Sequence, residues 1–231
     1  MNFLFDIDGT LTPPREPMNS EFKAFFAKWT ARQRRQGNRV IFVTGSDKKK
    51  TIHQIGADLW KFADGSYQNC GNQLYVCGEL MRESNWRISA NLRLDILCLM
   101  EKSQWYGTAA NNIEERVGMV NISTIGRDCS KEQRKEYYEW DKLHLERRDI
   151  VTTLAHRHPK IDLSIGGEIS IDVYEKGKDK SQVIDRLGGR CVFVGDQCDT
   201  GGNDYTIAMK AYEYHHVKDY METWDLIKWI N

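Results

Sequence analysis

Long hydrophobic runs and an excess of charge of either sign are both missing from this sequence of 231 residues. No apolar stretch approaches the ~18 residues that a membrane-spanning helix needs. The first six residues contain no basic group and end in an acid, so they do not resemble an export signal. Lysine plus arginine and aspartate plus glutamate each total 33, whereas a general nucleic-acid binder needs an excess of basic contacts. We therefore expect a cytoplasmic protein with no membrane and no nucleic-acid partner.

Paired metal-binding cysteines are also absent. None of the six cysteines forms a CxxC pair, which excludes a zinc ribbon. Without an export signal, we expect these cysteines to be reduced. Internal repeats and low-complexity segments are missing too, and the composition of 40% hydrophobic and 29% charged residues is that of an ordinary globular protein with a buried core.

An alternation of short strands and helices fills the first 65 residues. Apolar strands are predicted at residues 3–5 and 40–43, and helices over 20–36, capped by Asn19 or Ser20, and over 47–55. One face of the first helix carries four aromatic side chains, Phe22, Phe25, Phe26 and Trp29. Strands that alternate with helices predict a parallel sheet and an α/β fold.

The pattern changes between residues 78 and 177. Helices are predicted at 86–103, 130–146 and 148–156, and strands at 113–117, 119–123, 162–165 and 168–172. Gly166-Gly167 joins the last two strands as a two-glycine hairpin turn. Residues 178–231 then return to the first pattern. We expect an α/β core formed by residues 1–77 and 178–231, with an α+β cap of residues 78–177 inserted into it.

Polar clusters follow three strands of the predicted core. They are Asp6-Ile7-Asp8-Gly9-Thr10, Thr44-Gly45-Ser46, and Gly195-Asp196 with Gly201-Gly202-Asn203-Asp204. Ligands of open parallel sheets bind beyond the carboxyl ends of the strands, so the clusters should meet in one place. Converging carboxylates repel one another unless a cation lies among them, and a ligand set made of oxygen suits Mg²⁺.

This arrangement suits phosphoryl transfer. A carboxylate such as Asp6 can attack phosphorus to give an aspartyl phosphate. Asp8, two residues later, can act as general acid and base, and Lys180 can balance the charge of the transferring group. The run of lysines at 48–50 is expected to be a solvated helix face.

The sequence Asp6-Ile7-Asp8-Gly9-Thr10-Leu11-Thr12 resembles the first motif of the haloacid dehalogenase superfamily of phosphotransferases. Thr44-Gly45, Lys180 and Gly195-Asp196 with Gly202-Asn203-Asp204 resemble its other three motifs, in the same order. The resemblance implies a Rossmann-like core with a parallel sheet and an inserted cap of the C2b type.

Three segments of the predicted cap, residues 115–127, 166–173 and 177–180, are similar to the eukaryotic-type phosphomannomutases. That resemblance implies Mg²⁺ binding by Asp6, by Asp8 through its carbonyl, and by Asp196, and a catalytic role for Thr44 beside Asp6, Asp8 and Lys180. It implies phosphate and sugar binding by Arg15, Gly45, Arg116, Asn121, Arg127, Arg134, Ser170 and Asp172.

The function implied by this family is the interconversion of hexose 6-phosphate and hexose 1-phosphate, for mannose or glucose, as in GDP-mannose biosynthesis. A hexose 1,6-bisphosphate activator and a homodimer formed through the caps are implied as well. A sugar-phosphate phosphatase on the same scaffold is the alternative, because Thr44 stands where the mutases usually have glycine. A non-catalytic binding protein is a third hypothesis, which the intact set of Asp6, Asp8, Lys180 and Asp196 opposes.

Overall fold

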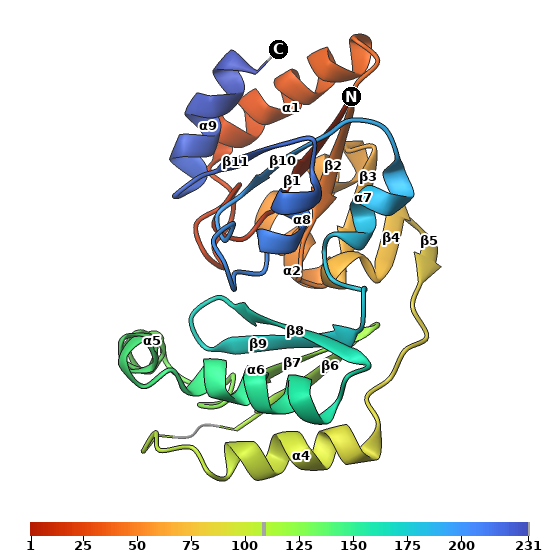
Figure 1. The fold of residues 1–231 in the computed structure, drawn as a ribbon. Helices are drawn as coiled ribbons and strands as arrows, with labels where there is room; N and C mark the ends of the chain where they lie inside the picture. The colour runs from red at the N-terminus through yellow and green to blue at the C-terminus, as the bar shows by residue number, and fades with distance from the viewer. Residues whose placement is uncertain (108–109, 231) are drawn as a thin grey trace. The chain divides into compact units, whose positions relative to one another are not determined.

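Two sheets, one of seven strands and one of four, organise the residues that the computed structural model describes, 1–107 and 110–230 (Figure 1). The chain divides into two units. The first contains Met1–Ser84, Lys178–Thr200 and residues from Asp204 onward, and the second contains Asn85–Gly177 with Gly201–Asn203. The first unit is thus built from both ends of the chain.

The seven-stranded sheet belongs to the first unit. Its strand order is β11 (Glu213–His216), β10 (Cys191–Gly195), β1 (Asn2–Phe5), β2 (Arg39–Val43), β3 (Gly65–Gln68), β4 (Gln73–Val76) and β5 (Glu79–Glu83). The pairs from β11 to β3 are parallel, and β4 and β5 are antiparallel. The predicted α/β fold class with a parallel sheet is confirmed.

Helices cover both faces of this sheet because β1 has apolar side chains on each side. Phe3 and Phe5 pack in one buried cluster with residues of α1 (Ser20–Arg35), α2 (Lys48–Ile55), α3 (Ala57–Phe62) and α9 (Tyr220–Trp229). Leu4 packs in the opposite cluster with residues of α7 (Gln182–Leu187) and α8 (Tyr205–Lys210). Of the two predicted caps of α1, the structure uses Asn19, whose side chain accepts from two backbone N–H groups of the first turn.

The second unit has a four-stranded antiparallel sheet in the order β6 (Ile113–Arg116), β7 (Met119–Ser123), β9 (Ser170–Glu175) and β8 (Ile161–Gly166). α4 (Ala90–Met100) and α6 (Glu146–Arg157) contribute to the apolar cluster on one of its faces. α5 (Lys131–His144) begins at the predicted capping box of Ser130 and Gln133. Among the described helices, none combines the length and the apolar character that a bilayer crossing requires.

The sequence pattern does not show several of the helices and strands. α3, α8, β11 and the strands β3 to β5 were not predicted. β5 is exposed at every position, Leu80 and Met81 included, because it is an edge of the sheet. The first unit consequently extends to Ser84 and not only to residue 77. The predicted two-glycine turn at Gly166-Gly167 is wrong. Gly166 pairs with Ser170 in the sheet, so the turn consists of Gly167, Glu168 and Ile169.

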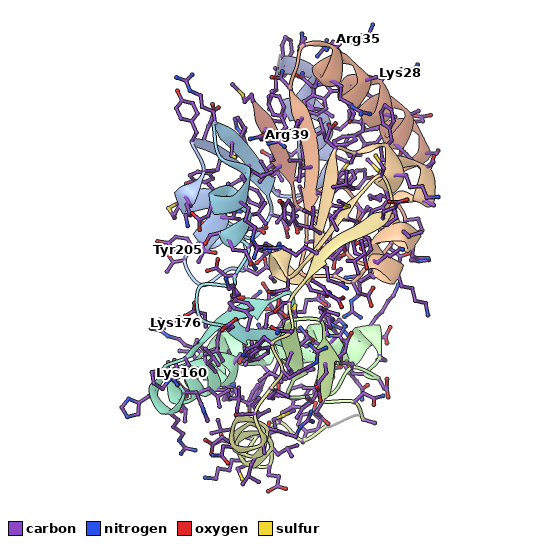
Figure 2. All side chains as sticks on the ribbon, turned by 90° about the vertical axis from the view of Figure 1, so that its right-hand side faces the viewer. Lys28, Arg35, Arg39, Lys160, Lys176 and Tyr205 are labelled. Atoms are coloured by element: carbon purple, nitrogen blue, oxygen red, sulfur yellow. The ribbon has the colours of Figure 1, made fainter. Side chains whose placement is uncertain are left out.

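The aromatic stripe of α1 anchors that helix to the sheet. Phe26 is fully buried, and its ring lies 5.1 Å from that of Phe5 and 6.1 Å from that of Phe42. Lys28 and Arg35 project outward from the same helix (Figure 2). Phe26→Ala should lower the free energy of unfolding by about 3–5 kcal/mol, because it leaves a cavity that the neighbouring aromatic rings cannot move to fill.

Lys28→Ala serves as the matched control and should stay within about 0.5 kcal/mol of the wild type. Urea unfolding followed by tryptophan fluorescence measures both. Equal losses for the two variants would show that the aromatic stripe does not anchor the helix.

Candidate active site

A buried ion-pair network lies where β1 ends. The Nζ atom of Lys180 donates to Oδ1 of Asp6 at 2.7 Å and to Oδ1 of Asp204 at 2.6 Å. The side chain of Lys180 is 1% exposed, and those of the two carboxylates are 6% and 1% exposed. Asp6 directly follows β1, whereas Lys180 precedes α7 and Asp204 precedes α8, so the network joins three distant segments of the chain.

Asp196, which directly follows β10, completes an acidic cluster with Asp6 and Asp204. Ligand oxygens of the three carboxylates lie within 4.8 Å of one another. Such a set of oxygen donors fits a hard divalent cation such as Mg²⁺. The sequence predicted Asp6 and Asp196 as ligands and placed Asp204 in the same group of converging acids. The structure shows Asp204 as the third carboxylate.

Gly9 makes room for the carboxylate of Asp196. Its φ is +95°, and a Cβ built on it would lie 2.5 Å from Oδ2 of Asp196. Thr10 also donates from its hydroxyl to Oδ1 of Asp196, at 3.3 Å. The DxDGT motif therefore requires glycine at this position for two reasons, the positive φ and the close approach of the Asp196 carboxylate.

The charges of the cluster do not balance without a cation. Burial raises the pKa of Asp6 well above its usual value, and Asp204 and Asp196 add to the rise while Lys180 opposes it. Burial, with Asp204, raises the pKa of Asp196 to about 6. Burial disfavours the charge of Lys180, but Asp204 and Asp6 outweigh it and raise the pKa of the ammonium group. Three carboxylates face one ammonium group, and the pKa values of Asp6, Asp196 and Lys180 are all raised.

Asp8 points into a different set of hydrogen bonds. Its Oδ2 accepts from Nζ of Lys50 at 2.5 Å, and its Oδ1 accepts from the Gln54 side chain at 2.8 Å and from the backbone N–H of Arg15 at 2.6 Å. Burial alone would raise the pKa of Asp8, but Lys50 and these hydrogen bonds lower it below the usual value. The carboxylate is therefore held in its charged form, in which it can accept a proton.

Lys50 and Gln54 are contacts of the site that sequence reasoning missed. The prediction of a solvated face for lysines 48–50 is wrong for Lys50, although it fits Lys49, which is exposed. Lys50 and Gln54 are four residues apart on α2, a spacing that places both on one side of the helix. That spacing, directly after the Thr44-Gly45-Ser46 motif, was the available signal.

Thr44 and Gly45 follow the end of β2, and Arg15 lies in the loop between β1 and α1. Thr44 follows β2 and is 1% exposed, and its Oγ1 accepts from the backbone N–H of Ser46 at 3.1 Å. The cap of α2 is Asp47, whose side chain accepts from the N–H of Lys50. Arg15 has a left-handed φ of 66°, and its backbone N–H donates to Oδ1 of Asp8.

The second unit gathers most of its predicted site residues on one face of its sheet. Arg127 donates to Oδ1 of Asn121 and, at 3.4 Å, to the hydroxyl of Ser170. Asn121 donates to Oδ1 of Asp172 at 2.6 Å. Register explains the meeting, because Asn121 on β7 lies opposite Asp172 on β9. Both side chains are 4% exposed, so this is a built polar site and not a solvated surface.

Arg116 and Arg134 reach this set from its two sides. Arg116 lies on β6 and donates twice to the carboxylate of Glu114, at 2.9 Å in each case. Arg134 comes from α5, is 7% exposed, and lies 3.9 Å from the carboxylate of Glu168 in the turn before Ser170. The guanidinium groups thus come from three separate elements.

Comparison with known proteins points in one direction. A sequence profile of the eukaryotic phosphomannomutases matches residues 26–228. A phosphomannomutase of Saccharomyces cerevisiae is 36% identical over 216 residues, which cover 88% of this chain and 83% of the yeast protein. One from Encephalitozoon cuniculi is 36% identical over 220 residues, which cover 89% of this chain and 83% of that protein.

Solved structures of lower identity share the fold. The C-terminal domain of a trehalose-6-phosphate phosphatase of C. albicans superimposes with a TM-score of 0.64 at 15% identity, covering 98% of this chain and 90% of that one. A sugar phosphatase of subclass IIB of the haloacid dehalogenase superfamily gives a TM-score of 0.61 at 15% identity, covering 98% and 97%. At this identity the likeness concerns the fold alone.

Gly9→Ala should weaken the binding of a divalent cation about tenfold or more, because the new methyl group displaces the carboxylate of Asp196. Gly37→Ala is the matched control: its φ is +78°, but nothing lies within 4 Å of its Cβ position. Titration of Mg²⁺ against the melting temperature measures both. A Gly9 variant that binds Mg²⁺ as the Gly37 variant does would show that Gly9 does not make room for the cation site.

Stability without a cation should fall as the pH rises. The pKa of Asp196 in the folded chain, about 6, lies above that of an unfolded aspartate. Its contribution to stability is therefore complete below about pH 4 and is lost as the pH rises through about 6. Mg²⁺ takes the place of the proton, so it should raise the melting temperature by several degrees at about pH 7.5 and much less at about pH 5.

Thermal melts with EDTA and with Mg²⁺ at both pH values measure this effect, and Asp196→Asn should reduce both the fall in stability between these pH values and the Mg²⁺ response. The same Mg²⁺ response at both pH values would contradict the assignment of Asp196 to the cation site.

Proposed function

The chain belongs to the eukaryotic phosphomannomutase family, within the haloacid dehalogenase superfamily, and on that basis we propose that it interconverts the 6-phosphate and the 1-phosphate of mannose or glucose. The observation that carries the proposal is the buried network of Asp6, Lys180, Asp196 and Asp204 at the carboxyl ends of β1 and β10. It has the parts that transfer through an aspartyl phosphate requires.

Asp6 is the proposed nucleophile. Lys180 orients its carboxylate by the hydrogen bond of 2.7 Å and offsets the negative charge that gathers as a phosphate approaches. Asp204, fully buried, holds Lys180 from the other side and is itself fixed by the backbone N–H of Gln197. Because the network is almost closed to solvent, little water can compete with a sugar hydroxyl for the phosphoryl group.

Mg²⁺ is the proposed cofactor. The carboxylates of Asp6 and Asp196 fit it, together with the backbone carbonyl of Asp8 that the family resemblance assigns, and Asp204 adds a third acid nearby. When bound, the cation supplies positive charge beside the transferring phosphoryl group.

Asp8 is the proposed acid and base. Lys50, Gln54 and the backbone of Arg15 hold it as a carboxylate, the form that takes the proton from an attacking sugar hydroxyl. The same group returns a proton to the leaving oxygen in the opposite transfer. Thr44 and Gly45 are proposed to contact the phosphoryl group, beyond the end of β2.

The second unit is proposed to hold the phosphate that is not reacting. Arg116, Arg127 and Arg134 supply guanidinium groups, which match phosphate oxygens in pairs. Ser170, Asn121 and Asp172 are proposed to bind sugar hydroxyls, and Arg15 to contact phosphate. A hexose 1,6-bisphosphate activator, a homodimer formed through the second unit, a cytoplasmic location and a place in GDP-mannose biosynthesis belong to the same proposal.

Phosphatase activity is the second candidate, and one observation favours it: Thr44 occupies the place of a glycine usual in mutases. Phosphorus NMR of the protein with mannose 1-phosphate, Mg²⁺ and a hexose bisphosphate separates the two. Conversion to mannose 6-phosphate without free phosphate supports the mutase, and free phosphate alone shows the phosphatase.

Asp6→Asn should abolish turnover, by at least about a thousandfold, because an amide cannot form the phosphoenzyme. Asp58→Asn is the control, since Asp58 is an exposed acid paired with Lys23 on another part of the first unit. Initial rates by the NMR assay measure both. Retained turnover in the Asp6 variant would remove Asp6 as the nucleophile.

A further inference from the structure

Glu114 connects two of the arginines on the polar face of the four-stranded sheet. Its carboxylate accepts from Nε and Nη2 of Arg116, both at 2.9 Å, and forms an ion pair with Arg127, whose Nε lies 2.6 Å away. The two guanidinium groups therefore share one carboxylate. Neither the sequence motifs nor the proposed mechanism gives this glutamate a role.

The position of Glu114 follows from strand register. Glu114 on β6 lies opposite Asn121 on β7, and Asn121 lies opposite Asp172 on β9, so the three side chains form a row across one face. Arg127 links the row, because it forms an ion pair with Glu114 and donates to Asn121. A continuous chain of hydrogen bonds and ion pairs thus runs from Arg116 to Asp172.

Two like charges cannot stay side by side in a half-buried site without a counter-charge. The side chains of Arg116 and Arg127 are only 11% and 21% exposed, so solvent screens their repulsion weakly. Glu114 offsets this repulsion. It also fixes the plane of the Arg116 guanidinium group by contact along one edge, and a planar guanidinium group has N–H donors along more than one edge.

We propose that Glu114 is a positioning residue of the anion site, which holds Arg116 and Arg127 in the orientation that receives the non-reacting phosphate of the substrate. This inference rests on the proposed function of the second unit. Removing the carboxylate has two opposite effects, since it makes the site more positive but frees two long side chains. Without Glu114, the phosphate has to order the two arginine side chains on binding and also has to offset their mutual repulsion. We expect the free-energy cost of both to exceed the gain from the added positive charge.

Glu115, the next residue on the same strand, provides a matched control. It is also paired with an arginine, Arg93, but its side chain is 46% exposed and lies on the opposite face of β6. Glu114→Gln should raise KM for mannose 1-phosphate about tenfold, with a smaller fall in kcat, whereas Glu115→Gln should leave both values near those of the wild type. An unchanged or lower KM for the Glu114 variant would overturn the proposal.

A direct readout separates positioning from stability. In the wild type, the Nε–H signals of Arg116 and Arg127 should be resolved and protected from exchange in nitrogen-15 NMR spectra, and Glu114→Gln should remove that protection while the melting temperature stays within a few degrees. Glu114→Asp keeps the charge but shortens the side chain, so it should also raise KM. Wild-type behaviour of the aspartate variant would show that charge alone matters and would refute the positioning role.

Different results contradict the proposed function and the role of Glu114. A wild-type protein that produces no hexose 6-phosphate contradicts the proposed function. An active wild type with a Glu114→Gln variant of unchanged KM and unchanged arginine signals contradicts only the role of Glu114.

Discussion

The ammonium group of Lys180 is the point on which the first unit depends. It is buried between Asp6 and Asp204, and its two hydrogen bonds, of 2.7 and 2.6 Å, join the first strand of the chain to segments that begin more than 170 residues later. A lysine is buried at this depth only when carboxylates compensate its charge. The same pairing that closes the fold at the carboxyl ends of β1 and β10 therefore also aligns the proposed nucleophile.

Each unit gathers charged side chains in one small site. The first unit brings three carboxylates to one ammonium group, and the second brings arginines from β6, α5 and the segment after β7 toward a few carboxylates. Each unit can lower its own electrostatic energy by binding a partner of the opposite charge, a cation in one case and a phosphate in the other.

Motifs and periodicity predicted the parts of the molecule in which local signals and tertiary structure agree. The aromatic stripe of α1 and the strands β1, β2 and β10 are confirmed, as is the α/β class. The edge strand β5 could not be predicted, because both of its faces are solvated and no alternation of apolar residues remains. The turn of the β8–β9 hairpin was misplaced because Ile169, fully buried, belongs to the loop and not to a strand.

Prediction of the site had a similar limit. Asp6 and Asp196 could be grouped from the sequence because strand ends converge in a parallel sheet, and Lys180 because it resembles a motif of the same family. The contact of Lys50 with Asp8 could not be found in that way, since a run of three lysines does not show which of them turns inward. Only the position of α2 beside β1 selects Lys50, and it leaves Lys49 in solvent.

The place of β1 in the sheet has a consequence for how the protein is made. β1 lies between β2, which follows within 40 residues, and β10, whose Cys191 pairs with Asn2. During synthesis, β1 to β5 emerge first, and one edge of β1 stays open until β10 has left the ribosome. A newly made chain is thus exposed to pairing with other chains until β10 emerges, and a product that stops at Gly177 keeps that open edge permanently.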